Sequence, residues 1–168
     1  MRLETIKIGR IVNAHGIRGE VRVQPEGQDP AFLTRFKTFY LDGAPVTPTA
    51  NHVHKSLVLM KFPGVDDMNA ALALKGKDLY IRRADAKLPD GVCFDAELLG
   101  MAVYDAATGQ ALGEITRVDP YPAHKVYTVK GAREYLIPAV PDVFIKSVDL
   151  DDNRMEVHVW EGMAADEN

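Results

Sequence analysis

The chain has 168 residues and a formal net charge of −4, with 46% hydrophobic and 26% charged residues, which is ordinary for a globular protein of one domain or two small ones. Its single cysteine, Cys93, excludes an internal disulfide and favours a reducing compartment, so we expect a cytoplasmic location. The N-terminus lacks the apolar run of a signal peptide, and no apolar run approaches the roughly 20 residues of a membrane-spanning helix, so we expect no membrane partner.

Two short strands joined by a glycine-containing turn are predicted at the start of the chain. Apolar and polar residues alternate through residues 6–8 and 21–23, which is the period of half-buried strands. The connection includes residues 15–20 (HGIRGE), in which Gly16 and Gly19 suit a positive φ or a close backbone approach. The cations around this connection are Lys7, Arg10, Arg18 and Arg22.

Further strands and one short helix are predicted in the rest of the first half. Residues 38–41 and 79–81 have strand composition, and residues 53–62 are apolar on both faces, as in a central strand. Asp66 or Asp67 caps a short helix that continues to residue 75 and stops at a glycine.

A linker is predicted at residues 82–92, because this stretch has little hydrophobic periodicity and contains Pro89 and Gly91. The second half then returns to short strands at near-regular spacing, which is typical of a small barrel. The expected strands are 101–104, 112–118, 126–129, 135–138, 143–150 and 154–160. We therefore predict an all-β fold of two small β-barrel domains, residues 1–88 and 93–164, with one short helix in the first.

Neither a metal site nor a catalytic constellation is indicated. His52 and His54 share a strand face, but zinc needs further ligands at recognisable spacing, and none is found. Residues 149–153 imitate the start of a calcium loop, yet Arg154 and Trp160 occupy the positions that require Gly and Glu, so we predict a hairpin turn. With no phosphate-binding loop either, we expect no cofactor and no enzymatic activity.

Charge is divided unevenly between the two halves. Residues 1–88 hold 14 Lys+Arg and 9 Asp+Glu, a net charge of +5, whereas residues 89–168 hold 6 and 15, a net charge of −9. A polyanion such as RNA would favour the first half, and a basic protein would favour the second. Alternatively, the two halves only attract each other.

The individual candidate residues each allow two interpretations. His15 is either an RNA contact or a turn residue bonded to nearby backbone, and we favour the turn role. The four cations named above are either phosphate contacts or members of a solvated strand face. The loop at residues 121–125 (YPAHK) either anchors a protein partner through its aromatic residue or simply joins two strands.

Five segments follow one another along the chain: the 15–20 motif, Val65-Asp66-Asp67 with the helix after it and Gly76, Leu98-Leu99-Gly100, Gly113-Glu114-Ile115, and residues 135–138 (YLIP). Taken in this order, they resemble the ribosome maturation factor RimM family. The resemblance covers the chain from residue 6 to residue 162.

The resemblance implies a non-enzymatic, monomeric assembly factor with a translation-factor-like barrel followed by a PRC barrel. Such a factor binds the immature small ribosomal subunit and promotes assembly of its head and processing of 16S rRNA without catalysing cleavage. Its partners would be 16S rRNA and the small-subunit head protein numbered nineteen. The expected rRNA or subunit contacts are Lys7, Arg10, His15, Arg18 and Arg22. The expected ribosomal-protein contacts are Phe94, Asp95, Glu97, Tyr121 and His124.

Two departures from the family pattern stand out. Asn13-Ala14 replaces the usual Gly-Pro before the His-Gly pair, and asparagine also tolerates a positive φ. Cys93-Phe94 replaces a tyrosine pair implicated in subunit binding, so both hydroxyl groups are absent here. Two alternatives remain open: an RNA-modifying or RNA-processing enzyme, and a PRC-barrel interaction module unrelated to ribosomes.

Overall fold

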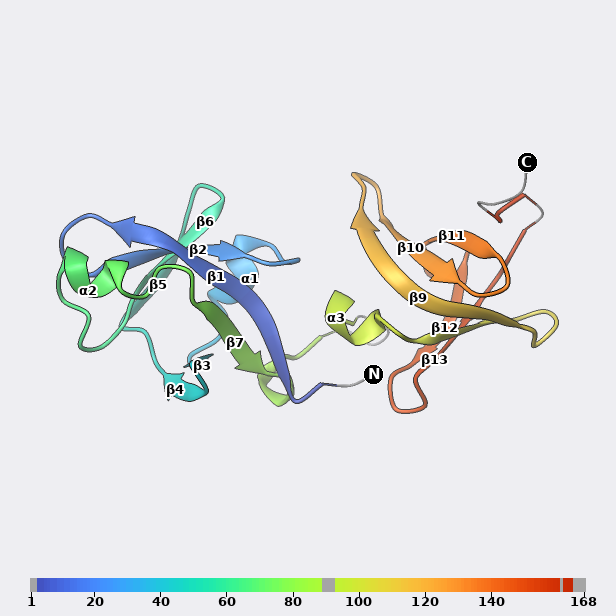
Figure 1. Ribbon diagram of the computed structural model, residues 1–168, viewed down its shortest axis with the longest axis horizontal. Coiled ribbons are helices and arrows are strands. Elements are labelled where there is room, and N and C mark those ends of the chain that lie inside the picture. The colour runs from blue at the N-terminus through green and yellow to red at the C-terminus, as the bar shows by residue number, and fades with distance from the viewer. Residues whose placement is uncertain (1–2, 89–92, 161, 165–168) are drawn as a thin grey trace. The chain divides into compact units, whose positions relative to one another are not determined.

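The computed structural model describes residues 3–88, 93–160 and 162–164 (Figure 1). The chain forms two compact units, Glu4–Lys87 and a second that comprises Leu3 and the described residues from Leu88 onward. Each is built mainly from short strands, so the predicted all-β class with two small β domains is confirmed. The predicted linker lies partly outside the described residues, and its described start belongs to a strand and a 3₁₀ turn, η1 (Arg83–Asp85).

Among the described residues, the first unit contains one seven-stranded sheet in the order β4-β3-β7-β1-β2-β6-β5, in which each pair is antiparallel. Its strands are β1 (Thr5–His15), β2 (Glu20–Pro25), β3 (Phe39–Leu41), β4 (Ala44–Val46), β5 (Ala50–His54), β6 (Leu57–Lys61) and β7 (Asp78–Arg82). The fully buried side chains include Ile8, Ile11, Val21, Val23, Met60 and Leu79. Alternation in β2 therefore places its valines in the core and Arg22 on the opposite face.

The prediction of a single strand over residues 53–62 is wrong. Two antiparallel strands, β5 and β6, meet there, with His54 opposite Leu57. Lys55 adopts a left-handed φ of 57°, which reverses the chain, and lysine gives no turn signal comparable to glycine or asparagine. The apolar character on both faces comes from β6 alone, where Val58, Leu59 and Met60 are all buried.

Two short helices accompany this sheet. The predicted helix is α2 (Met68–Leu72), which is shorter than expected and is capped by Asp67, whose carboxylate accepts a hydrogen bond from Ala70 N at 2.7 Å. The sequence analysis did not predict α1 (Pro30–Leu33), in which Asp29 Oδ1 accepts from Ala31 N at 3.1 Å and proline occupies the first turn.

The described part of the second unit contains one six-stranded sheet in the order β11-β10-β9-β8-β13-β12. All its pairs are antiparallel except β8 with β13. Its strands are β8 (Ala102–Asp105), β9 (Ala111–Pro120), β10 (Lys125–Lys130), β11 (Glu134–Pro138), β12 (Ile145–Asp149) and β13 (Arg154–Val157), preceded by a helix, α3 (Asp95–Leu98). Its core includes Met101, Val103, Ile115, Val129, Ile137, Met155 and Val157.

The segment that imitates a calcium loop is a hairpin turn between β12 and β13, as predicted. Asp149 Oδ1 accepts a hydrogen bond from Asp152 N at 3.0 Å, and Asn153 has a left-handed φ of 52°. The acidic side chain at position 149 thus supports the turn itself.

Candidate functional site

The loop between β1 and β2 has the backbone geometry that its glycines predict. Gly16 and Gly19 have φ values of 70° and 93°, in the left-handed region. Gly19 also approaches another segment closely, since a Cβ atom there would overlap the carbonyl of Val65. Between the glycines, Ile17 is 75% exposed and Arg18 is also exposed, so the loop presents both side chains to solvent.

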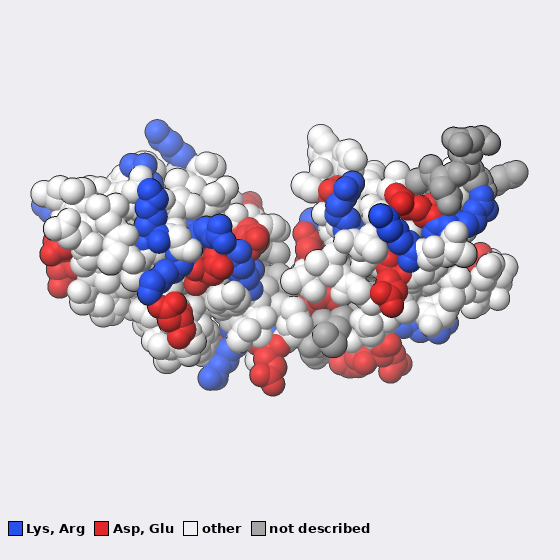
Figure 2. Space-filling view, in the orientation of Figure 1, with Lys and Arg blue, Asp and Glu red and all other residues white. Residues whose placement is uncertain are grey.

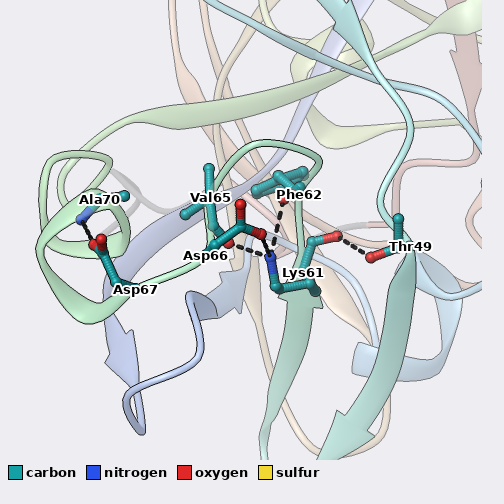
Figure 3. A network of polar contacts seen from close by, with 7 residues as sticks. All are labelled: Thr49, Lys61, Phe62, Val65, Asp66, Asp67 and Ala70. Atoms are coloured by element: carbon teal, nitrogen blue, oxygen red, sulfur yellow. Dashed lines mark hydrogen bonds and ion pairs between the residues drawn. The ribbon is translucent and has the colours of Figure 1, made fainter.

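The segment that supports this loop is held by Lys61 at the end of β6 (Figure 3). Lys61 Nζ donates a hydrogen bond to the carbonyl of Val65 and forms an ion pair with Asp66 Oδ1 at 2.8 Å. The Lys61 carbonyl in turn accepts from Thr49 N at 2.7 Å. A cation at the strand end therefore fixes the very carbonyl against which Gly19 packs.

His15 and Arg22 are brought together across β1 and β2. Arg22 Nε donates to His15 Nδ1 at 3.2 Å, and the His15 ring lies 5.4 Å from the ring of His54 at the end of β5. The expected backbone partner of His15 is thus replaced by the Arg22 side chain. Among the described residues, no acid forms an ion pair with Arg18 or Arg22.

Lys7 and Arg10 lie on the same strand, β1, but they are engaged by acids. Arg10 Nε binds Asp78 Oδ1 at 2.8 Å, and Lys7 Nζ lies 3.2 Å from Glu26 Oε2 and 3.4 Å from Asp78 Oδ1. The hydrogen bond from Arg10 lowers the pKa of the Asp78 carboxyl, and Lys7 adds to this effect. Figure 2 shows acidic side chains beside several basic ones on the viewed face of the first unit. These two cations are therefore less available to an external anion than Arg18 and Arg22.

In the second unit, two of the five expected contact residues are buried. Phe94 is 3% exposed and Glu97 is 0% exposed. Glu97 Oε1 accepts a hydrogen bond from Phe94 N at 3.2 Å, which closes the first turn of α3. Both residues therefore support the start of this unit, and a partner reaches them only if that turn opens.

The other three expected residues are accessible. Asp95 Oδ1 accepts a hydrogen bond from Lys125 Nζ at 2.6 Å, and His124 Nδ1 lies 3.0 Å from the Lys125 carbonyl. Tyr121 is 58% exposed at the start of a loop that is closed by a hydrogen bond from Tyr121 N to the His124 carbonyl at 3.1 Å. Burial raises the pKa of the neighbouring Tyr127 to about 12, with Asp95 as a further cause. An exposed aromatic ring, a histidine and the lysine that pairs with Asp95 thus lie within residues 121–125.

Comparison with known protein families places these features in context. The model of the RimM N-terminal domain matches residues 6–86, and that of the RimM PRC barrel domain matches residues 95–163. The chain belongs to the RimM family. The resemblance that the 15–20 motif and the later segments suggested is therefore confirmed.

RimM relatives align along almost the whole chain. A ribosome maturation factor RimM from Acetivibrio thermocellus is 38% identical over 174 residues, which cover 98% of this chain and 99% of the relative. A protein of the same name from Clostridioides difficile is 34% identical and covers 96% of this chain and 97% of its own. The crystal structure of a protein called RimM from Pseudomonas aeruginosa is 30% identical, covers 92% of this chain and 97% of that one, and has a TM-score of 0.46.

The loop between β1 and β2 also depends on residues that the sequence did not mark as part of the site. Lys61, Val65 and His54 all contact the loop or its support, although they lie about 40 residues beyond it in the chain. The only sequence signal for this support was local: Lys61 precedes the Pro63-Gly64 turn, and Asp66 follows it.

Residues 3–88, 93–160 and 162–164 of this RimM-family structure form neither a metal-binding cluster nor a membrane-spanning helix. No group of three or more His, Cys, Asp or Glu side chains there is arranged to hold a metal ion. In the same ranges, no helix is long and apolar enough to cross a membrane.

Proposed function

We propose that this protein is a ribosome maturation factor that binds the immature small subunit and promotes assembly of its head and processing of 16S rRNA, without catalysing cleavage. The curated relatives carry the name ribosome maturation factor over nearly their full lengths, which supports the general role. The opposite net charges of the two halves, +5 and −9, support two different kinds of partner.

The first unit would contact 16S rRNA through the loop between β1 and β2 and through the face of the sheet that carries Arg22. The observation that carries this proposal is that Arg18 and Arg22 lack ion pairs within the described residues, whereas Lys7 and Arg10 are paired with acids. Arginine guanidinium groups bind phosphates through charge-assisted hydrogen bonds. Arg18 and Arg22 would therefore supply most of the phosphate contacts, with His15 positioned by Arg22.

The second unit would bind a basic protein of the subunit head, the one numbered nineteen. Tyr121 offers an exposed aromatic ring, His124 lies in the same loop, and Asp95 is held beside that loop by its ion pair with Lys125. Aromatic side chains are frequent anchors in protein interfaces, and the acidic surroundings favour a cationic partner. Phe94 and Glu97 would contribute by holding α3 in place.

The proposal is tested by co-sedimentation of the full chain with small subunits isolated before and after completion of assembly. Retention on immature subunits with less on mature ones is the expected result. Absence of sedimentation with either would refute the proposal. Incubation of the chain with precursor rRNA and magnesium belongs to the same test, because cleavage or modification would identify an enzyme instead.

A further inference from the structure

Four side chains from three strands gather on one face of the first sheet. His15 ends β1, Arg22 lies in β2, and His52 and His54 lie in β5. Arg22 Nε donates to His15 Nδ1 at 3.2 Å, and the rings of His15 and His54 lie 5.4 Å apart at an interplanar angle of 57°. We call His15, Arg22, His52 and His54 the histidine face.

The strand register extends this cluster to His52. Arg22 lies opposite Leu59, and Leu59 lies opposite His52, so the three occupy one row across β2, β6 and β5. Residues two apart on a strand point to the same side, which places His54 beside His52 on this face. Leu59, which lies between Arg22 and His52, is only 3% exposed, whereas both histidines of β5 are exposed. The surface therefore combines a buried leucine side chain with accessible histidine rings.

Arg22 gives the histidine face a hydrogen-bond donor for an anionic group. Glu20 is the acid in the next row across the sheet. It lies opposite His15 of β1 and opposite Lys61 of β6. Lys61 is occupied by Asp66 and the Val65 carbonyl. Arg22 uses Nε for His15, so its terminal nitrogens remain for another acceptor. The described residues of this face include no set of side chains that could hold a metal ion.

We propose that the histidine face binds unpaired RNA, with bases stacked on the rings of His52 and His54 and a phosphate bound by Arg22. The inference rests on the proposed function and identifies which form of RNA the first unit takes. Bases are inaccessible within an RNA double helix, but in single-stranded segments they stack on aromatic side chains, including histidine, and on guanidinium planes. A face of rings beside a single arginine suits that form of RNA.

The test uses the full chain and a short fluorescent single-stranded RNA of mixed sequence, with the same sequence as a duplex for comparison. We expect tighter binding of the single strand and about tenfold weaker binding by His54→Ala. His54→Phe keeps a ring and should bind like the parent, whereas His54→Lys introduces a positive charge without a ring and should bind as weakly as His54→Ala. His158→Ala, in the second unit, is the matched control and should change nothing.

Several results would overturn the inference. One is retention of affinity by His54→Lys together with its loss in His54→Phe, which would show an electrostatic site. Another is equal binding of single strand and duplex. A third is the absence of single-strand binding at about 100 μM protein, where even non-specific contacts bind RNA. Because His54 is exposed, these substitutions should leave the thermal midpoint of unfolding unchanged. If a shift is measured, the binding comparison is made with His52→Ala, at the other exposed histidine of β5.

Co-sedimentation of the same variants with immature small subunits separates this inference from the proposed function. If the parent sediments with subunits and His54→Ala matches it in both assays, the histidine face does not bind RNA and the proposed function stands. If His54→Ala loses subunit binding but keeps RNA affinity, the face binds a protein and the inference is wrong. If single-strand binding follows the ring but the parent does not sediment with subunits, the proposed function fails and the inference about the face holds.

Discussion

Gly19 lies directly against the carbonyl group of Val65, so closely that any side chain at position 19 would overlap it. The same carbonyl accepts a hydrogen bond from Lys61 Nζ. The loop that displays Arg18 is therefore positioned by a backbone contact to a distant segment, and that segment is fixed by a lysine at the end of β6.

Replacement of Gly19 by alanine should destabilise the protein by about 2–4 kcal/mol, because the Cβ atom meets backbone and the φ of 93° is left-handed. Gly16→Ala is the matched control: its φ of 70° is also left-handed, but a Cβ there meets nothing within 4 Å, so we expect a loss of about 1 kcal/mol. Urea unfolding measures both. Equal losses would contradict the close contact at position 19.

Replacement of Lys61 by methionine should lower the free energy of unfolding by about 1–2 kcal/mol, because the Val65 carbonyl loses its charged donor. Lys75→Met, at an exposed lysine after α2, should change it by less than about 0.5 kcal/mol. Thermal and urea unfolding of the two variants provide the comparison. If the two lysines prove equivalent, Lys61 has no special role in supporting the loop.

Arg18→Gln should weaken binding of the full chain to immature subunits several-fold and reduce the dependence of log affinity on log salt by about one unit, as expected for one lost phosphate contact. Arg10→Gln should have a smaller effect on both quantities, because Arg10 is paired with Asp78 at 2.8 Å. Sedimentation at several salt concentrations measures the two slopes. A larger effect at Arg10 would show that the anion approaches the Asp78 side of β1 instead.

Asp78 should contribute to acid sensitivity. The hydrogen bond from Arg10 lowers its pKa below the ordinary value of 3.8, so between these two pKa values the unfolded chain binds more protons than the folded protein. The stabilising contribution is complete above about pH 4 and is lost as the pH falls through the folded pKa. Asp78→Asn should therefore lose less stability than the parent on acidification below pH 4, as measured by urea midpoints. Asp85→Asn, at an exposed acid, should follow the parent curve.

Tyr127 should ionise at higher pH than an ordinary tyrosine. Burial raises its pKa from 10.0 to about 12, and the charge of Asp95 adds to the shift. Its contribution to stability is complete below pH 10 and is lost as the pH rises toward 12, since the unfolded chain releases the proton first. Titration of phenolate absorbance should show a late step that is absent from Tyr127→Phe. If Tyr127→Phe instead removes amplitude from the ordinary step near pH 10, this hydroxyl is in water.

Local sequence rules predicted those elements whose signals are themselves local. The glycine pair of the 15–20 loop, the Asp67 cap and the turn at residues 149–153 all formed as their residue types indicate. The break between β5 and β6 did not follow, because Lys55 adopts a left-handed conformation without a turn residue to signal it. The helix α1 carried a signal in Asp29-Pro30, but four residues show no helical period.

The candidate site was less predictable, because it depends on pairing across strands. Lys7 and Arg22 look equivalent in sequence, yet their environments differ: Lys7 meets Glu26 and Asp78, whereas Arg22 meets His15. Only the register of β1 with its neighbours decides this. Likewise, Glu97 is buried where its carboxylate accepts a hydrogen bond from Phe94 N at the start of α3. Alternation of polar and apolar residues does not reveal this burial.

A density map of the full chain bound to an immature small subunit tests the central claim most directly. We expect 16S rRNA against Arg18 and Arg22 of the first unit, and a basic head protein against Tyr121 of the second. A map in which the first unit contacts only protein, or in which the second unit carries the rRNA contacts, would contradict this division of roles.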